Sequence, residues 1–241
     1  MPGGFNSIAD INQRREVVGG LLVEPELDKN VNMEDRVIAG PSGDQKIRIY
    51  TAKKSSKPAP ALIYIHGGGM ILGSIEGEEG VAQMFCAESG ATVISVDYRK
   101  APEFPYPAGA DDCYSAAKWV FDNASELGID KNNIGIYGGS AGGGLTLAVV
   151  LMARDRKSMN FKYMMPIYPM IDDRNETPSS HAITEIGIWD RDGNKEAWNW
   201  YLGGKSADEY AAPARAKDVS GLPPAFIDVG EMDLFRDEDT D

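Results

Sequence analysis

Short apolar runs rich in β-branched residues alternate along this chain with segments of helical periodicity. Such alternation is typical of βαβ units, in which each buried strand is followed by a crossover helix. Five runs have the length and composition of buried strands: Ala61 to Ile65, Ala91 to Val96, Ile134 to Tyr137, Tyr163 to Tyr168, and Ala225 to Val229. The pattern therefore predicts an α/β fold with a mostly parallel central sheet flanked by helices.

Two local patterns add an edge and one helix to this sheet. Residues 46–50 alternate polar and apolar side chains, which predicts a half-exposed antiparallel edge strand that pairs with residues 36–39. Residues 53–58 then form the loop between edge and core. A helix ending near Leu127-Gly128 is predicted by apolar residues at i, i+4, i+7, i+8 and i+11: Cys113, Ala117, Val120, Phe121 and Ala124.

Two regions depart from the alternation of strands and helices. They are residues 1–30 and residues 172–222, and the second carries Trp189, Trp198 and Trp200. We expect them to form the two parts of a helical cap, although each aromatic could equally belong to the core of a surface helix. The predicted division is 1–30 and 172–222 for the cap, 31–171 for the core, and 223–241 for a return to the core.

Composition and charge narrow the classes of function. Apolar residues make up 42% of the 241 residues and charged residues 25%, as in folded globular proteins. The net charge of −13 argues against nucleic acid and anionic membrane surfaces as partners. Cys86 and Cys113 lack the spacing of a zinc site or a disulfide framework, and we expect no metal and no cofactor. The sequence has no apolar run of membrane-spanning length and no leader pattern, which predicts a cytoplasmic protein.

A candidate nucleophile lies in Gly138-Gly139-Ser140-Ala141-Gly142, which matches G-x-S-x-G. The match alone is weak evidence, but the apolar strand 134–137 runs directly into it and a helix-compatible segment follows. This is the strand-turn-helix of a nucleophile elbow, which presents the serine at a helix N-terminus. A phosphate-binding loop is disfavoured because neither a dinucleotide fingerprint nor a Walker lysine is present.

A second glycine turn follows the strand that ends at Ile65. His66-Gly67-Gly68-Gly69 has the form of the loop that supplies oxyanion-hole donors in lipases and esterases. Glycine is needed there because the backbone itself must approach the substrate carbonyl. We predict that the N–H groups of Gly67, Gly68 and Ala141 are the donors. His66 is predicted to brace the loop by hydrogen bonding.

With these motifs the chain resembles the hormone-sensitive-lipase-like family of bacterial carboxylesterases, which have the α/β-hydrolase fold. Residues 97–103 are similar to the family's D-Y-R-L-A-P-E segment, with Lys100 in place of its leucine. The resemblance continues through residues 168–173 and 223–230, and so covers roughly residues 60 to 240. It implies that the N-terminal region and the stretch after Asp173 build a cap.

The resemblance also implies the remaining members of a catalytic triad. Asp233 occupies the position of the family's catalytic acid; Glu231 is the near alternative, and residues 237–239 are expected to begin a solvated helix. The family's histidine follows the acid, yet only eight residues come after Asp233 here. His66 and His181 both precede Asp233 and are poor substitutes. We therefore expect the C-terminal strand and helix to be missing and residues 225–229 to form an unprotected edge.

The predicted activity is hydrolysis of short-chain carboxylic esters through an acyl-Ser140 intermediate, with a small-molecule ester as substrate. The 241-residue chain is expected to be nearly inactive for want of a base. One alternative is a non-catalytic, receptor-like member of the family, as the plant gibberellin receptors are. An amidase or a lactonase using the same site is another. The resemblance and the bare edge also make a homodimer reasonable.

Overall fold

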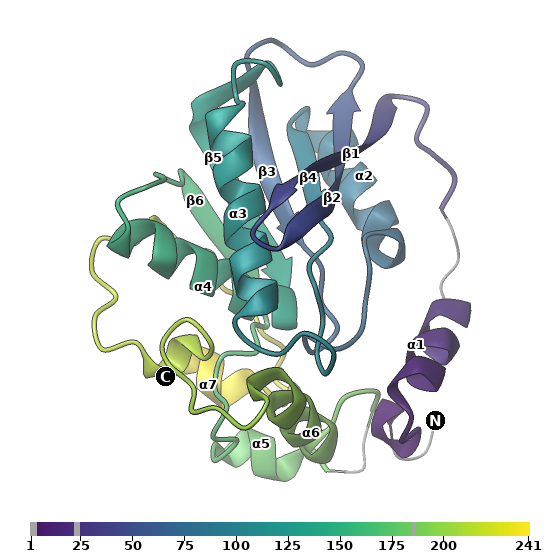
Figure 1. The fold of residues 1–241 in the computed structure, drawn as a ribbon, viewed down its shortest axis with the longest axis vertical. Coiled ribbons are helices and arrows are strands. Elements are labelled where there is room, and N and C mark those ends of the chain that lie inside the picture. The colour runs from purple at the N-terminus through teal and green to yellow at the C-terminus, as the bar shows by residue number, and fades with distance from the viewer. Residues whose placement is uncertain (1–3, 22–24, 185–186) are drawn as a thin grey trace.

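A six-stranded sheet forms the centre of the computed structural model, which describes residues 4–21, 25–184 and 187–241. The strand order is β1-β2-β4-β3-β5-β6. Strands β3 to β6 pair in parallel, whereas β1 and β2 form an antiparallel edge (Figure 1). The bounds are β1 (Val31–Gly40), β2 (Gly43–Ala52), β3 (Ala59–Ile65), β4 (Thr92–Val96), β5 (Ile129–Gly139) and β6 (Tyr163–Ile167). The predicted α/β architecture is confirmed.

The hairpin has the predicted pairing. Arg36 lies opposite Ile47 and Ala39 opposite Asp44, and both strands extend further than the sequence pattern suggested. Strand β2 also pairs antiparallel with β4, so it joins the hairpin to the parallel sheet. The loop of residues 53–58 connects β2 to β3 as expected.

Residues 46–50, however, are not the predicted half-exposed edge strand. The edge strand is β1, whereas β2 lies between β1 and β4 with Ile47 to Tyr50 buried. Arg48 keeps the polar alternation although it is buried, because it pairs with Asp35 and Glu79.

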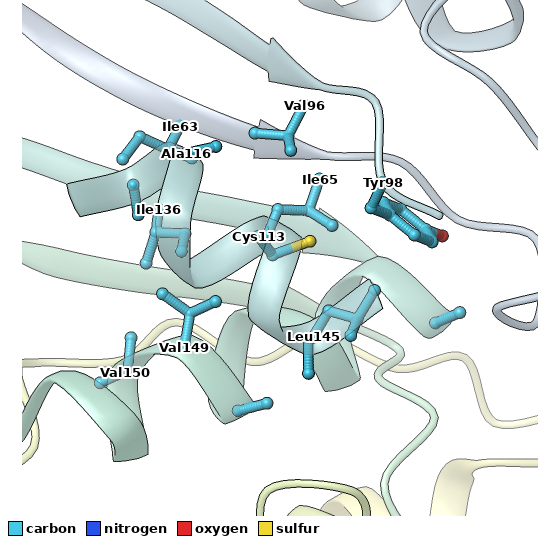
Figure 2. Packing of buried hydrophobic residues seen from close by; sticks show 14 of the residues in the cluster. Ile63, Ile65, Val96, Tyr98, Cys113, Ala116, Ile136, Leu145, Val149 and Val150 are labelled. Carbon is cyan, nitrogen blue, oxygen red and sulfur yellow. The ribbon is translucent and has the colours of Figure 1, made fainter. Parts of the chain in front are cut away.

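Helices cover both faces of the sheet because successive strand residues point to opposite sides. On one face Leu62 and Tyr64 pack with Ala82 and Cys86 of α2 (Glu79–Ser89). On the other face lie α3 (Ala108–Asp122) and α4 (Ala141–Asp155). Figure 2 shows this second layer, where side chains of both helices surround strand residues Ile63, Ile65, Val96 and Ile136.

Helix α3 buries the predicted face, since Cys113, Ala117, Val120 and Phe121 are all buried. It ends at Asp122, however, and not near Leu127-Gly128. The carbonyl of Trp119 accepts hydrogen bonds from both the backbone N–H and the side-chain Nδ2 of Asn123, which closes the last turn. Residues 123–128 form turns. The apolar spacing that predicted the helix therefore continues past its end, to Ala124.

The regions predicted as a cap contribute several short helices. They are η1 (Phe5–Ser7), α1 (Ile11–Gly20), α5 (Pro178–Ala182), α6 (Arg191–Leu202) and η3 (Pro213–Arg215). Helices α1, α5, α6 and the C-terminal α7 (Arg236–Thr240) gather at one end of the sheet (Figure 1). Arg14 Nη1 of α1 lies 2.6 Å from Glu196 Oε2 of α6, so the two parts contact each other. These contacts suit a two-part cap, which stays a prediction.

The last segment departs from expectation in two ways. Residues 225–229 form only two isolated parallel bridges to β6, at Ala225 and Asp228, instead of a continuous strand. Phe226 and Ile227 are 57% and 46% exposed, and no strand pairs with their outer side in the described part of the chain. Helix α7 forms near the predicted position but is not solvated. Its Glu238 is buried, and Oε1 accepts hydrogen bonds from the N–H groups of Ile171 and Asp172.

Candidate active site

Ser140 lies in a strained turn between β5 and α4. Its backbone angles are φ 55° and ψ −120°, a region that non-glycine residues rarely adopt. The turn is held by a hydrogen bond from Ser140 N–H to Ile167 O (2.9 Å). The carbonyl of Ser140 accepts from the N–H of Gly144 (3.1 Å) and Met170 (3.0 Å). The G-x-S-x-G segment therefore has the strand-turn-helix geometry of a nucleophile elbow.

Two glycines allow the chain to turn so sharply at Ser140. A Cβ atom on Gly138 would lie 2.2 Å from Gly142 O, across the turn. One on Gly142 would lie 2.1 Å from Ile65 O, at the end of the neighbouring strand β3. No side chain fits at either distance, so these glycines are required by close packing between backbones.

The second glycine turn, residues 66–69, lies directly against this elbow. A Cβ atom on Gly67 would be 3.7 Å from Ser140 Cβ and 3.1 Å from Gly139 O. Gly68 and Gly69 have φ values of 111° and 62°, which favour glycine. The two turns come together because β3 and β5 are neighbouring parallel strands whose carboxyl ends meet at the same edge.

The hydrogen bonds of this loop differ from the predicted set of donors. Gly67 N–H donates to Glu78 Oε1 at 2.8 Å, so it is not available to a substrate. Within the described residues, the N–H groups of Gly68, Gly69 and Ala141 have no acceptor in the protein. The predicted donor set therefore contains one engaged amide, Gly67, and does not contain Gly69, whose N–H has no acceptor among the described residues. The glycine run was a signal for all three positions, but it could not identify the engaged amide.

His66 is buried next to this loop and contacts it directly. Its Nδ1 lies 2.8 Å from Gly67 O, and its ring stacks on Tyr98 with the centroids 4.3 Å apart. Burial, together with the positive charge of Lys100, lowers the pKa of His66 to about 3. The ring is therefore neutral near pH 7. Because Gly67 O can only accept, Nδ1 carries the proton and donates it, which is the contact that a bracing role requires.

Ser140 and Asp233 line the same cavity, which has a volume of about 350 Å³. Asp233 follows the bridge at Asp228, and its Oδ1 accepts a hydrogen bond from Phe235 N–H at 2.9 Å. The alternative acid, Glu231, is exposed and does not line the cavity. The other lining residues are mostly apolar: Tyr168, Ile183, Gly187, Trp189, Met232, Leu234 and Phe235.

Neither histidine lines this cavity. His66 lies behind the glycine loop, and His181 is exposed on α5, where its Nε2 is 3.5 Å from Arg191 Nη2. The structure thus brings together the predicted serine and acid but no imidazole. The described residues contain no cluster of ligands able to hold a metal ion. No helix among them has the length and apolarity needed to cross a membrane.

A serine in a strained elbow on a mostly parallel sheet, beside a second glycine turn, defines the class of α/β-hydrolases. The comparison with protein families agrees. A family described as alpha/beta hydrolase fold matches residues 62–241, and the chain belongs to it. The predicted resemblance to the hormone-sensitive-lipase-like bacterial carboxylesterases is also confirmed.

Several known proteins are similar to this chain. Carboxylesterase NlhH of Mycobacterium tuberculosis (strain ATCC 25618 / H37Rv) is 35% identical over 245 residues, covering 98% of this chain and 76% of the relative. Esterase LipI of the same strain is 32% identical, covering 97% and 73% respectively. The solved structure of a bacterial heroin esterase aligns with a TM-score of 0.93 at 34% identity, covering 100% of this chain and 78% of that one. These relatives support a carboxylic ester hydrolase.

Proposed function

We propose that this protein hydrolyses short-chain carboxylic esters through a covalent acyl-Ser140 intermediate. The observation that carries the proposal is the strained elbow of Ser140, which opens on one cavity together with Asp233. In such a mechanism the serine oxygen attacks the ester carbonyl, the alcohol leaves, and water then hydrolyses the acyl-enzyme. Asp233 would orient the base of the reaction, as the acid of a triad does.

The amides of Gly68, Gly69 and Ala141 would stabilise the oxyanion formed in this attack. Their N–H groups have no acceptor in the described part of the protein, and they belong to the two adjacent glycine turns. His66 would support Gly68 indirectly, because it holds Gly67 O, the carbonyl of the peptide that carries Gly68 N–H. The two groups of one trans peptide point in opposite directions, so fixing one fixes the other. Each such donor is worth about 10²–10³ in rate.

The size and lining of the cavity support a small acyl group. Its volume of about 350 Å³ is at the low end of ligand sites, and aromatic and aliphatic side chains form most of its walls. Trp189 narrows it above the glycine loop, since a Cβ atom on Gly69 would lie 2.1 Å from the indole ring. An acetyl or propionyl ester suits this space better than a long-chain ester.

The 241 residues by themselves are expected to turn over esters very slowly. Both histidines of the sequence lie outside the cavity, and a carboxylate alone removes a serine proton inefficiently near neutral pH. Loss of the base from a comparable triad lowers kcat by about 10⁶-fold. An assay of the purified 241-residue chain with p-nitrophenyl acetate measures this directly. Vigorous turnover that requires Ser140 would contradict the inferred lack of a base.

The role of Ser140 is best tested in the product of the complete gene. We expect Ser140→Ala to abolish hydrolysis of p-nitrophenyl acetate, and a fluorophosphonate probe to label Ser140 as judged by peptide mass spectrometry. Ser89→Ala, at an exposed serine at the end of α2, is the matched control and should keep full activity. Labelling at another residue, or full activity of Ser140→Ala, would refute the assignment.

One further candidate is a ligand-binding protein that keeps the site without turnover. The observation that favours it is the cavity lined by Ser140 and Asp233 but by no imidazole of the described residues. The hydrolysis assay combined with equilibrium dialysis distinguishes the two functions. A binding protein would retain a small ester in dialysis without hydrolysing it. A panel of amides and lactones separates esterase from amidase or lactonase activity.

A further inference from the structure

We propose that Glu78 is a positioning residue for the oxyanion loop, a role that rests on the proposed function of Ser140. Glu78 ends the short helix η2 (Glu76–Glu78) and lies outside both glycine motifs. Its Oε1 accepts the hydrogen bond from Gly67 N–H at 2.8 Å. Its Oε2 accepts from Tyr64 OH at 2.7 Å, so both carboxylate oxygens are engaged.

The partners of Glu78 are themselves rigid. Tyr64 is a buried residue of β3, and its ring packs against Tyr137 at 4.9 Å and Phe85 at 6.2 Å between centroids. Its hydroxyl therefore holds the carboxylate from the central sheet. Tyr64 thus fixes Glu78, and Glu78 fixes Gly67 N–H, relative to β3, the strand from which the glycine loop begins.

Glu78 and His66 hold the two peptide groups on either side of Gly67 Cα. Glu78 takes the N–H of the first peptide, and His66 takes the carbonyl of the second at 2.8 Å. The second peptide carries Gly68 N–H. Glycine has little conformational preference of its own, so a run of three would leave this N–H poorly oriented without such contacts. With both flanking peptides fixed, Gly68 N–H keeps one direction in the loop whose Gly67 lies against the Ser140 elbow.

Desolvation raises the pKa of the Glu78 carboxyl, against the hydrogen bonds from Tyr64 and Gly67. This burial distinguishes Glu78 from its neighbour Glu76, which is exposed and pairs with Lys46 at 2.9 Å. The two glutamates belong to the same short helix, so Glu76 provides a matched control.

The kinetic test uses the product of the complete gene and compares Glu78→Ala, Glu78→Gln and Glu76→Ala. We expect Glu78→Ala to lower kcat for p-nitrophenyl acetate about tenfold or more with KM nearly unchanged, because a misplaced donor weakens only transition-state binding. Glu78→Gln keeps an acceptor for Gly67 N–H and should restore most of kcat. Glu76→Ala should behave as wild type. Equal kcat in Glu78→Ala and wild type would overturn the proposal.

A second measurement does not depend on activity and can be made on the 241-residue chain. We expect the Gly67 amide to exchange with solvent at least tenfold faster in Glu78→Ala than in Glu76→Ala, as followed by NMR. Unchanged exchange of Gly67 would refute the contact itself. The two proposals fail differently: activity that survives Ser140→Ala removes the proposed function, whereas a normal kcat in Glu78→Ala alone removes only the role of Glu78.

Discussion

At the scale of single residues, the site depends on backbones that approach more closely than side chains allow. Gly142 is the clearest case, because a Cβ atom there would lie 2.1 Å from Ile65 O and 2.8 Å from His66 O. Both atoms belong to the backbone leading into the oxyanion loop and cannot rotate away. The elbow of Ser140 and the loop after β3 are therefore packed together at Gly142, which has no side chain that could take part in a reaction.

We expect Gly142→Ala to lower the free energy of unfolding by about 2 kcal/mol or more, since the backbone must shift to make room. Gly80→Ala is the control, because Gly80 is likewise the second residue of a helix, α2, and a Cβ atom there would be 3.6 Å from Pro25. That substitution should be neutral or stabilising by about 0.5 kcal/mol. Urea unfolding of both variants checks the difference; similar midpoints would contradict the inferred clash.

At the scale of elements, hydrophobic periodicity predicted the strands that frame the site but not the structure at the ends of the chain. Strands β3, β4 and β6 lie close to the predicted apolar runs, because a buried strand must be apolar on both faces, whereas β5 begins at Ile129, five residues before its predicted run. The acidic residues of α7 predict a solvated helix, yet it packs against the segment after β6. Its acids satisfy backbone N–H groups there, a contact that composition does not report.

Arg14 of α1 joins the two parts of the predicted cap. Arg14 is buried, donates from Nε to Ile8 O at 2.8 Å, and lies 5.2 Å from the centroid of the Trp200 ring. Arg15 instead contacts the core, with Nε donating to Ile71 O at 2.9 Å and a bidentate pair to Glu103. Helix α1 is thus attached both to α6 and to the loop that follows the oxyanion turn.

At the scale of the whole molecule, the pH dependence of stability is set in part by the acidic side chains that the fold buries. The chain is rich in such groups, with a net charge of −13. Burial raises the pKa of Glu238 to about 8 and that of Asp239 to about 9, with the neighbouring Asp233 adding to both. A carboxyl whose pKa is raised by folding contributes stability below its unfolded pKa and loses it as pH rises through the folded value. The molecule should therefore become less stable as the pH rises from about 3.8 to about 9 on account of these two acids of α7.

We expect Glu238→Gln to raise the free energy of unfolding at pH 8 by about 1–3 kcal/mol. The amide keeps an oxygen acceptor for the N–H groups of Ile171 and Asp172 while removing a buried charge. Wild type and variant should converge near pH 4, where Glu238 is protonated in both states. Thermal melts across this range test the prediction, with the exposed Glu231→Gln as control. A variant equally stable or weaker at pH 8 would contradict it.

The sequence by itself determined the parallel sheet, the edge hairpin, the strand-turn-helix around Ser140 and the glycine turn after Ile65, since each depends on local periodicity or backbone freedom. Only the tertiary structure decided that Glu78 engages Gly67 N–H, that His181 stays outside the cavity, and that Glu238 is buried. The reason is physical: periodicity reports which side chains are buried, whereas a hydrogen-bond partner is selected by packing between distant segments.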